Sequence, residues 1–298
     1  MSANVSSVTF VVDRSERGKL ALTGAEAKDF LQGQVTNDIV GLTPGTGCYA
    51  AFLTHKGKML GDMRVFDLGD ELLLDCERVA LQELFNMINR YKLGRDVELH
   101  KRTLELGLLS VIGPDAPDLA GPQEHDSARH TLGGADVIAV RTDLGIDLFF
   151  AAADKAAVRA ALDFPDATEE EAEIVRVEHG RPRYGLDLDD TVIPQEAGLN
   201  ERAVSFTKGC YVGQETVARL YYRGKPNRRL LGLRLSEPVE PGTELKLGEK
   251  VVGKLGSVVV SPDHGPIALA LVRREANPGD TVDLAGSTAL IVDVPFAR

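Results

Sequence analysis

The stretch KGCYVGQETVAR, residues 208–219, holds the residues with the clearest capacity for chemistry. Apolar residues recur at helical spacing after Gly213, which predicts that a helix begins there and leaves Cys210 just before its N-terminus. The unpaired backbone N–H groups at such a position, together with Lys208 and Arg219, would favour a thiolate or a bound anion. The segment is therefore a candidate site for thiol chemistry or anion binding.

The glycines and the charges of this region support the same interpretation. Gly209 and Gly213 would let the backbone approach a ligand closely. Between Thr207 and Arg229, six Lys or Arg residues stand against one acid, Glu215, a local balance of +5 in a chain whose net charge is −11. We call residues 207–229 the basic island, and such an island on an acidic body is typical of an anion site. The alternative is a loop around a small packed thiol, because most cysteines only pack.

Several common kinds of site are excluded by the sequence. The six histidines are scattered without ligand spacing, and His125 and His130 are expected in a polar loop. The three cysteines, Cys48, Cys76 and Cys210, are too few and too far apart for a disulfide framework or a four-cysteine metal site. No GxxxxGK[ST], HExxH or GxSxG motif occurs. We therefore expect no metal site and no disulfide.

The composition also limits the compartment and the partners. The longest apolar stretches fall far short of the roughly 20 residues that cross a bilayer, so no membrane span is expected. The N-terminus lacks the features of a signal or transit peptide, which favours a cytoplasmic protein. The net charge of −11 makes duplex nucleic acid a poor partner, because binding it depends on neutralising phosphates with Lys and Arg.

Two patterns follow one another along the chain and predict the elements that would position these residues. Strands are predicted at 8–13, 48–53, 59–67, 71–75, 97–100, 104–112, 137–141 and 146–151. Helices are predicted after Thr23 as an N-cap, and at 79–91, 154–162 and 168–179. Because strands and helices do not alternate strictly, an α+β fold is favoured over a doubly wound parallel sheet. From about residue 230, short strands separated by Gly, Pro and Asp predict a small barrel-like β domain.

Five stretches of the chain resemble one family, in the expected order. KGCYVGQETVAR looks like the signature of the YgfZ family, whose members share the fold of the glycine-cleavage T-protein, an aminomethyltransferase, and bind tetrahydrofolate. The other four are GAEAKDFLQGQVTNDI (24–39), YAAFLTHKGKMLGDMRVF (49–66), RVEHGRPRYGLDLDDTVIPQEAGLN (176–200) and RGKPNRRLLGL (223–233). The resemblance implies two intertwined α+β units in residues 1–222, a C-terminal β-barrel domain in residues 226–298, and a central cleft for tetrahydrofolate or a derivative.

The resemblance also implies roles for three residues outside the signature. Asp62 lies where the transferase relatives have a carboxylate near the reactive nitrogen of folate, and an acid in a partly enclosed pocket could relay a proton. Arg176 matches an arginine before a pterin-facing turn, where a planar set of donors suits a heterocycle. Asp147 lies where those transferases carry a glutamate that hydrogen-bonds the pterin, although the surrounding TDLGID departs from their pattern. The alternatives are an exposed strand acid for Asp62, a surface ion pair with Glu173 or Glu169 for Arg176, and an ordinary strand residue for Asp147.

Within the signature, Cys210 would be the reactive or metal-touching group in the function that the resemblance favours, so that Cys210 and Asp62 are the two candidate catalytic residues. Its neighbours are candidate folate contacts: Lys208, Gly209, Gly213, Gln214, Glu215 and Arg219. The basic island could recognise the glutamate tail of folate through charge-assisted hydrogen bonds, or equally an RNA phosphate or a partner protein.

The leading hypothesis is a folate-binding factor, weakly enzymatic or not enzymatic, that supports the assembly or repair of iron–sulfur clusters and so affects tRNA modification indirectly. One thiolate cannot hold a cluster, which normally takes four protein ligands, so iron–sulfur enzymes or cluster-assembly proteins are the expected partners. The alternative is a folate-dependent aminomethyl- or methyltransferase in which Asp62 moves protons and Cys210 is structural. Direct RNA binding is least supported, because the acidic chain lacks an aromatic run of the kind that stacks bases.

Overall fold

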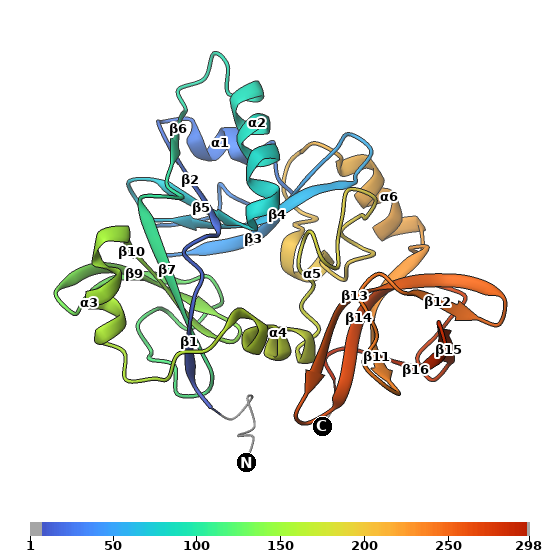
Figure 1. The fold of residues 1–298 in the computed structure, drawn as a ribbon. Coiled ribbons are helices and arrows are strands. Elements are labelled where there is room, and N and C mark those ends of the chain that lie inside the picture. The colour runs from blue at the N-terminus through green and yellow to red at the C-terminus, as the bar shows by residue number, and fades with distance from the viewer. Residues whose placement is uncertain (1–7, 297–298) are drawn as a thin grey trace.

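The structure is a computed structural model that describes residues 8–296 of the chain (Figure 1). One sheet has five antiparallel strands in the order β3-β4-β5-β2-β6. We call it the first sheet. Its strands are β2 (Gly18–Thr23), β3 (Gly47–Leu53), β4 (Met59–Asp67), β5 (Leu72–Cys76) and β6 (Glu98–Lys101).

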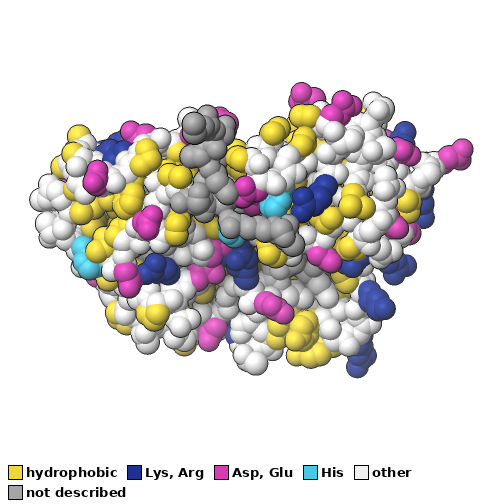
Figure 2. All heavy atoms as spheres, turned by 90° about the horizontal axis from the view of Figure 1, so that it is seen from below, with side chains coloured by type: hydrophobic (Ala, Val, Ile, Leu, Met, Phe, Trp, Pro, Cys, Tyr) yellow, Lys and Arg dark blue, Asp and Glu magenta, His cyan; other side chains and the backbone are white. Residues whose placement is uncertain are grey.

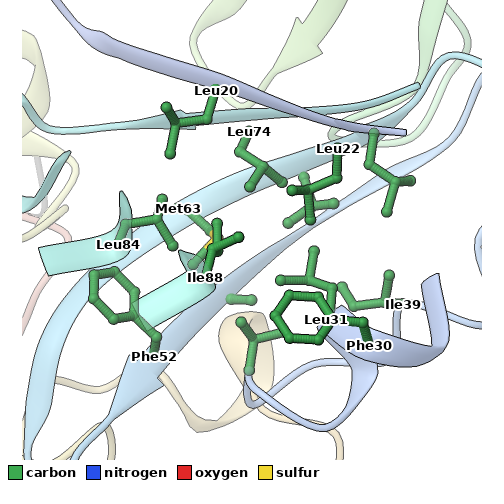
Figure 3. Close-up of a cluster of buried hydrophobic side chains, with 14 of the residues drawn as sticks. Leu20, Leu22, Phe30, Leu31, Ile39, Phe52, Met63, Leu74, Leu84 and Ile88 are labelled. Atoms are coloured by element: carbon green, nitrogen blue, oxygen red, sulfur yellow. The ribbon is translucent and has the colours of Figure 1, made fainter. Parts of the chain in front are cut away.

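Two helices, α1 (Ala27–Gln32) and α2 (Leu81–Tyr91), pack against the first sheet. The buried residues of α2 are Leu84 and Ile88, which lie one turn apart and so form a single apolar stripe. Figure 3 shows this stripe directed toward Met63 of the sheet, within the same buried cluster. The packing fixes the face of β4 from which the neighbouring Asp62 projects, because successive strand residues point to opposite faces.

The second sheet also has five antiparallel strands, in the order β1-β7-β10-β9-β8. They are β1 (Phe10–Asp13), β7 (Leu106–Ile112), β8 (Ser127–Leu132), β9 (Ala135–Thr142) and β10 (Gly145–Ala151). Helices α3 (Lys155–Ala160) and α4 (Glu169–Glu178) follow. The start of α4 is fixed by a capping box, in which Thr168 accepts a hydrogen bond from the backbone N–H of Glu171 and the Glu171 carboxylate accepts one in return.

The two sheets are interleaved along the chain. Strand β1 pairs with β7, with Phe10 opposite Ile112, and all five strands of the first sheet lie between them in sequence. The structure thus confirms the predicted α+β fold with two intertwined units. Its boundaries at residues 222 and 226, as limits of independent domains, stay a prediction.

A closed barrel follows, with the strand order β11-β14-β13-β12-β15-β16, and it confirms the predicted C-terminal β-barrel. Its strands are β11 (Arg228–Leu235), β12 (Glu244–Leu247), β13 (Lys250–Ser261), β14 (Gly265–Arg273), β15 (Thr281–Leu284) and β16 (Ser287–Val292). Apolar side chains from all six strands fill its interior. In Figure 1 the barrel lies beside α4, and contacts of α4 with β13 join it to the rest of the molecule.

The segment between α4 and the barrel contains two helices, α5 (Asn200–Ala203) and α6 (Gln214–Arg223), in otherwise irregular chain. Single 3-10 turns, η2 (Arg78–Ala80) and η3 (Ala152–Asp154), precede α2 and α3. Across residues 8–296, no helix is long and apolar enough to cross a membrane.

Candidate functional site

A cavity of about 160 Å³ lies between the two sheets, near the end of α4. Residues of β4, β5, β10, α4 and α5 contribute to its walls, together with the segment 181–184. Its lining includes seven arginines and six acids, so it is a charged cavity. Its volume suits a small ring better than a whole drug-sized ligand, which takes about 300 Å³ or more.

Asp62 lies on this wall and is only 6% exposed, so the alternative of an exposed strand acid is wrong. Burial raises its pKa to about 6, and a hydrogen bond with the Tyr49 side chain acts in the opposite direction. Its Oδ2 atom is buried and has no hydrogen-bond partner in the described part of the chain. Asp62 therefore combines a proton that exchanges near neutral pH with an unused acceptor.

Asp147 lies on the same wall and belongs to a buried ion network. Arg64 of β4 pairs with Asp147 of β10 at 2.5 Å and with Asp75 of β5 at 2.7 Å. Arg17 also pairs with Asp75, at 2.8 Å. Although burial acts to raise the pKa of Asp75, these two guanidinium groups lower it to about 2. The network holds the two sheets together across the cavity.

Nearly all the acidic side chains of the cavity wall form ion pairs with protein cations. Besides Asp75 and Asp147, pairs join Glu77 to Arg17 and Arg183, Glu124 to Arg202, and Asp143 to Arg181. Among the described residues, Asp62 is the one acid of the lining for which no ion pair is formed. Outside the cavity, acidic and basic side chains are scattered over the face seen in Figure 2, among hydrophobic and uncharged ones. Asp62 is thus the acid that a ligand could engage without displacing a protein cation.

Arg176 is buried in the cavity wall, and protein atoms already accept from all of its donors. It donates twice to Glu173, at 2.8 and 2.6 Å, and once to Asp187 at 2.9 Å. The hydroxyl of Ser257 and the carbonyl of Arg181 accept the remaining two. The ion pair with Glu173 that the sequence left as an alternative is present, although it is buried rather than on the surface. A direct contact of Arg176 with a heterocycle stays a prediction, and it would replace one of these bonds.

His125 also lines the cavity, although the sequence suggested only a polar loop. The residue does lie in the loop before β8, yet it is 7% exposed and its backbone φ is +74°. Its Nδ1 atom has no hydrogen-bond partner in the described structure. Burial lowers its pKa to about 3, and the nearby Arg64 and Arg202 lower it further. No signal in the sequence distinguishes His125 from the other histidines.

The signature segment lies elsewhere. Helix α6 begins at Gln214, with Gly213 as its N-cap at φ +84°, and Cys210 is exposed just before it, as the spacing predicts. A side chain at Gly213 would lie 2.5 Å from the carbonyl oxygen of Thr54, so the segment packs tightly on the turn between β3 and β4. Of the described residues that line the cavity, none belongs to residues 208–219. The structure thus brings Asp62, Asp147 and Arg176 together and leaves the signature outside.

Lys208 and the basic island are partly committed to the fold. The Lys208 ammonium donates to the carbonyl oxygens of Gln32, Val35 and Asn37, so it fixes the chain after α1. Burial lowers its pKa to about 8. Arg228 pairs with Glu196, which leaves the exposed cations of α6 and its C-terminal flank, Arg219, Arg223 and Lys225, available to solvent. Folate contacts by Lys208, Gly209, Gly213, Gln214, Glu215 and Arg219 stay predictions.

Two family models match the chain. Residues 2–144 match the GCVT N-terminal domain, and residues 227–296 match the C-terminal β-barrel domain of CAF17. Together they cover most of both sheets and the barrel.

Relatives and a solved structure agree with these matches. A putative chloroplastic transferase of Arabidopsis thaliana is 28% identical over 96% of this chain and 71% of its own length. The tRNA-modifying protein YgfZ of Colwellia psychrerythraea is 28% identical over 91% of this chain and 87% of its own. The glycine cleavage system aminomethyltransferase T of Bartonella henselae has the same fold, with a TM-score of 0.84 at 20% identity over 99% of this chain and 88% of its own.

Proposed function

This chain belongs to the YgfZ family of the glycine-cleavage T-protein superfamily, and on that premise we propose that it is a folate-binding factor that supports the assembly or repair of iron–sulfur clusters. The observation that carries the proposal is the separation of two groups. Asp62 is buried in a charged cavity, whereas Cys210 is exposed outside its walls. A protein with this arrangement can hold a small molecule and still offer a thiol to a partner protein.

Two buried atoms support folate as the ligand of the cavity. Oδ2 of Asp62 and Nδ1 of His125 have no partner within residues 8–296, and buried polar atoms are rarely left so. A reduced pterin ring carries several N–H donors along its edge, which would satisfy such atoms. Asp62 and Asp147 would contact the ring, while Arg176 would hold the wall in place. When bound, tetrahydrofolate would supply a carrier for one-carbon units on its ring nitrogens.

The exposed thiol of Cys210 supports a role in contacting a partner protein. Cys210 lies in a segment with three exposed cations, Arg219, Arg223 and Lys225, which could attract an acidic partner surface or the folate glutamate tail. Because one thiolate provides a single ligand, cluster contact would be transient or shared with an iron–sulfur enzyme or a cluster-assembly protein. The Colwellia relative is named a tRNA-modifying protein, which supports a link of this chain to tRNA modification. Three unpaired cysteines suit a reducing compartment, which supports a cytoplasmic location.

Calorimetric titration of the purified protein tests the folate part of the proposal. Tetrahydrofolate and its 5-formyl and 5-methyl forms are titrated into wild type, Asp62→Ala and Cys210→Ser. We expect binding by the wild type, a loss of roughly 5- to 150-fold in Asp62→Ala, and little change in Cys210→Ser. A wild type that binds none of the three would refute the proposed ligand.

Complementation of cells that lack the protein tests the iron–sulfur part. Cys210→Ser keeps most of the side-chain volume, and we expect it to abolish the rescue of iron–sulfur enzyme activity while folate affinity persists. The transferase alternative predicts the reverse: Asp62→Asn stops a measurable one-carbon transfer and Cys210→Ser rescues fully. That second pattern would make the chain an enzyme.

A further inference from the structure

His125 and Asp62 are two buried groups of one cavity that come from different parts of the fold. Asp62 projects from β4 of the first sheet, and His125 lies in the loop before β8 of the second sheet. Each is more than nine-tenths buried, and each has one side-chain atom without a partner in the described chain. The two residues thus contribute to one cavity lining from different parts of the fold, and each holds a buried hydrogen-bonding atom that the described chain leaves unused.

The imidazole of His125 is held in place by its surroundings. Its backbone N–H donates to the carbonyl of Arg141 at 2.9 Å, and its ring packs against Phe66 with 6.2 Å between centroids. Its φ of +74° is in the left-handed region, which residues other than glycine rarely adopt. Such conformations persist only where the surrounding structure imposes them, and they concentrate at ligand sites.

The neighbours of His125 also fix which ring nitrogen accepts. Its pKa is lowered to about 3, mainly by burial, so the ring is neutral at physiological pH. Nε2 lies 3.7 Å from a carboxylate oxygen of Glu124, which favours the proton on Nε2. We infer this tautomer from the neighbours, and in it Nδ1 is an acceptor. An ionised Asp62 likewise offers only acceptors.

We propose that Nδ1 of His125 accepts a hydrogen bond from a ring N–H of the bound heterocycle, opposite Asp62, so that the cavity selects reduced over fully oxidised folate. The proposal rests on the proposed folate function and adds a residue and a specificity to it. Tetrahydrofolate carries N–H groups at the ring positions where folic acid has bare acceptor nitrogens. Two acceptors on the protein would accept hydrogen bonds from these N–H groups of tetrahydrofolate. With folic acid they would instead face acceptor nitrogens, which is unfavourable in a buried site.

Affinity measurements on matched variants test the proposal. His125→Phe keeps a ring against Phe66 and removes both nitrogens, whereas His125→Asn restores an acceptor close to the place of Nδ1 and tolerates a positive φ. By calorimetry under reducing conditions, we expect His125→Phe to bind tetrahydrofolate roughly 5- to 100-fold more weakly and folic acid no more weakly. His125→Asn should recover part of the preference. The matched control is His130→Phe. The Nε2 atom of His130 contacts the carbonyl of Leu119, and His130 is not part of the cavity lining, so this variant should leave both affinities unchanged.

A second measurement needs no substitution in the cavity. In protein labelled with ¹⁵N-histidine, the Nδ1 resonance of His125 should move when tetrahydrofolate binds, and the His130 resonances should not. If wild type binds tetrahydrofolate while His125→Phe keeps its affinity and preference, or the Nδ1 resonance stays still, the role of His125 is overturned. If wild type binds no folate at all, the proposed function itself fails. These outcomes are distinguishable because the second concerns the unmodified protein.

Discussion

Arg64 and Asp147 join the two sheets across the cavity: the guanidinium belongs to β4, the carboxylate to β10, and their atoms lie 2.5 Å apart. Both side chains are largely buried, so neither charge could easily return to water if the other were removed. The walls of the cavity are thus fixed by charge pairing as well as by apolar packing.

Removing one partner of this pair should be costly. We expect Asp147→Ala to lower the free energy of unfolding by about 3 kcal/mol, because Arg64 would stay buried with Asp75 as its remaining partner. Denaturant unfolding of the full chain measures this value. The matched control is Asp70→Ala, which breaks an exposed pair with Arg129 and should cost less than about 1 kcal/mol. Equal effects of the two variants would contradict a structural role for Asp147.

Arg176→Ala should weaken folate binding and stability together. Its donors connect α4 through Asp187 and Ser257 to the barrel strand β13, so truncation leaves the buried Asp187 without its ion-pair partner. We expect a loss of about 3–5 kcal/mol in the free energy of unfolding, with weaker tetrahydrofolate binding as the cavity wall loosens. Denaturant melts and calorimetry on the same preparation test both. A variant that loses binding but keeps full stability would instead assign Arg176 a direct contact with the ligand.

Asp62 should make stability depend on pH in an unusual direction. Its folded pKa of about 6 is above the ordinary value of 3.8, so between these values the folded state holds more protons than the unfolded state. The Asp62 contribution to the free energy of unfolding is therefore lost as pH rises from about 4 to 6, by up to about 3 kcal/mol. The Asp62→Asn variant has no carboxyl at this position and therefore lacks this pH-dependent contribution to the free energy of unfolding. Unfolding curves at several pH values should converge for the two proteins at low pH and diverge above it, and parallel profiles would contradict the raised pKa.

The three cysteines should react with an alkylating agent in a definite order. Burial raises the pKa of Cys48 to about 12 and raises that of Cys76 as well, whereas Cys210 is exposed. At pH 8 we expect Cys210 to be labelled first and Cys76 last, as measured by mass spectrometry of peptides over time. In denaturant the three rates should become similar. Faster labelling of Cys48 than of Cys210 in the folded protein would exclude Cys210 as the accessible thiol.

The sequence predicts the elements with strong local signals and not those that depend on packing. Helix α4 follows from its capping residues and periodicity, and the barrel from its short strands. Strand β8 (SARHTL) is polar on its exposed positions and carries no comparable signal. Thr23, a good N-cap by residue type, is instead the last residue of β2, and the helix begins at Ala27 with Glu26 as N-cap.

The candidate site likewise contains residues that the sequence predicts and features that only the structure reveals. Asp62 and Asp147 could be proposed because they lie in or near stretches that resemble a family. The burial of Asp62 depends on contacts between residues far apart in sequence, as does the position of His125 beside Phe66. The donors of Arg176 are all used within the protein, and one of their acceptors is Ser257, 81 positions away in the sequence. Such long-range contacts leave no local pattern, so only the three-dimensional structure reveals them.

The pairing of β1 with β7 has a consequence for synthesis on the ribosome. Phe10 leaves the ribosome early, but its partner Ile112 is made about a hundred residues later. At roughly 5–20 residues per second, β1 waits on the order of 5–20 s before its neighbour exists. During that interval the first sheet can form from contiguous chain while the apolar segment FVV remains unpaired. Nascent-chain folding of this protein is therefore ordered by its topology, with the second sheet completed only after β7 and β10 emerge.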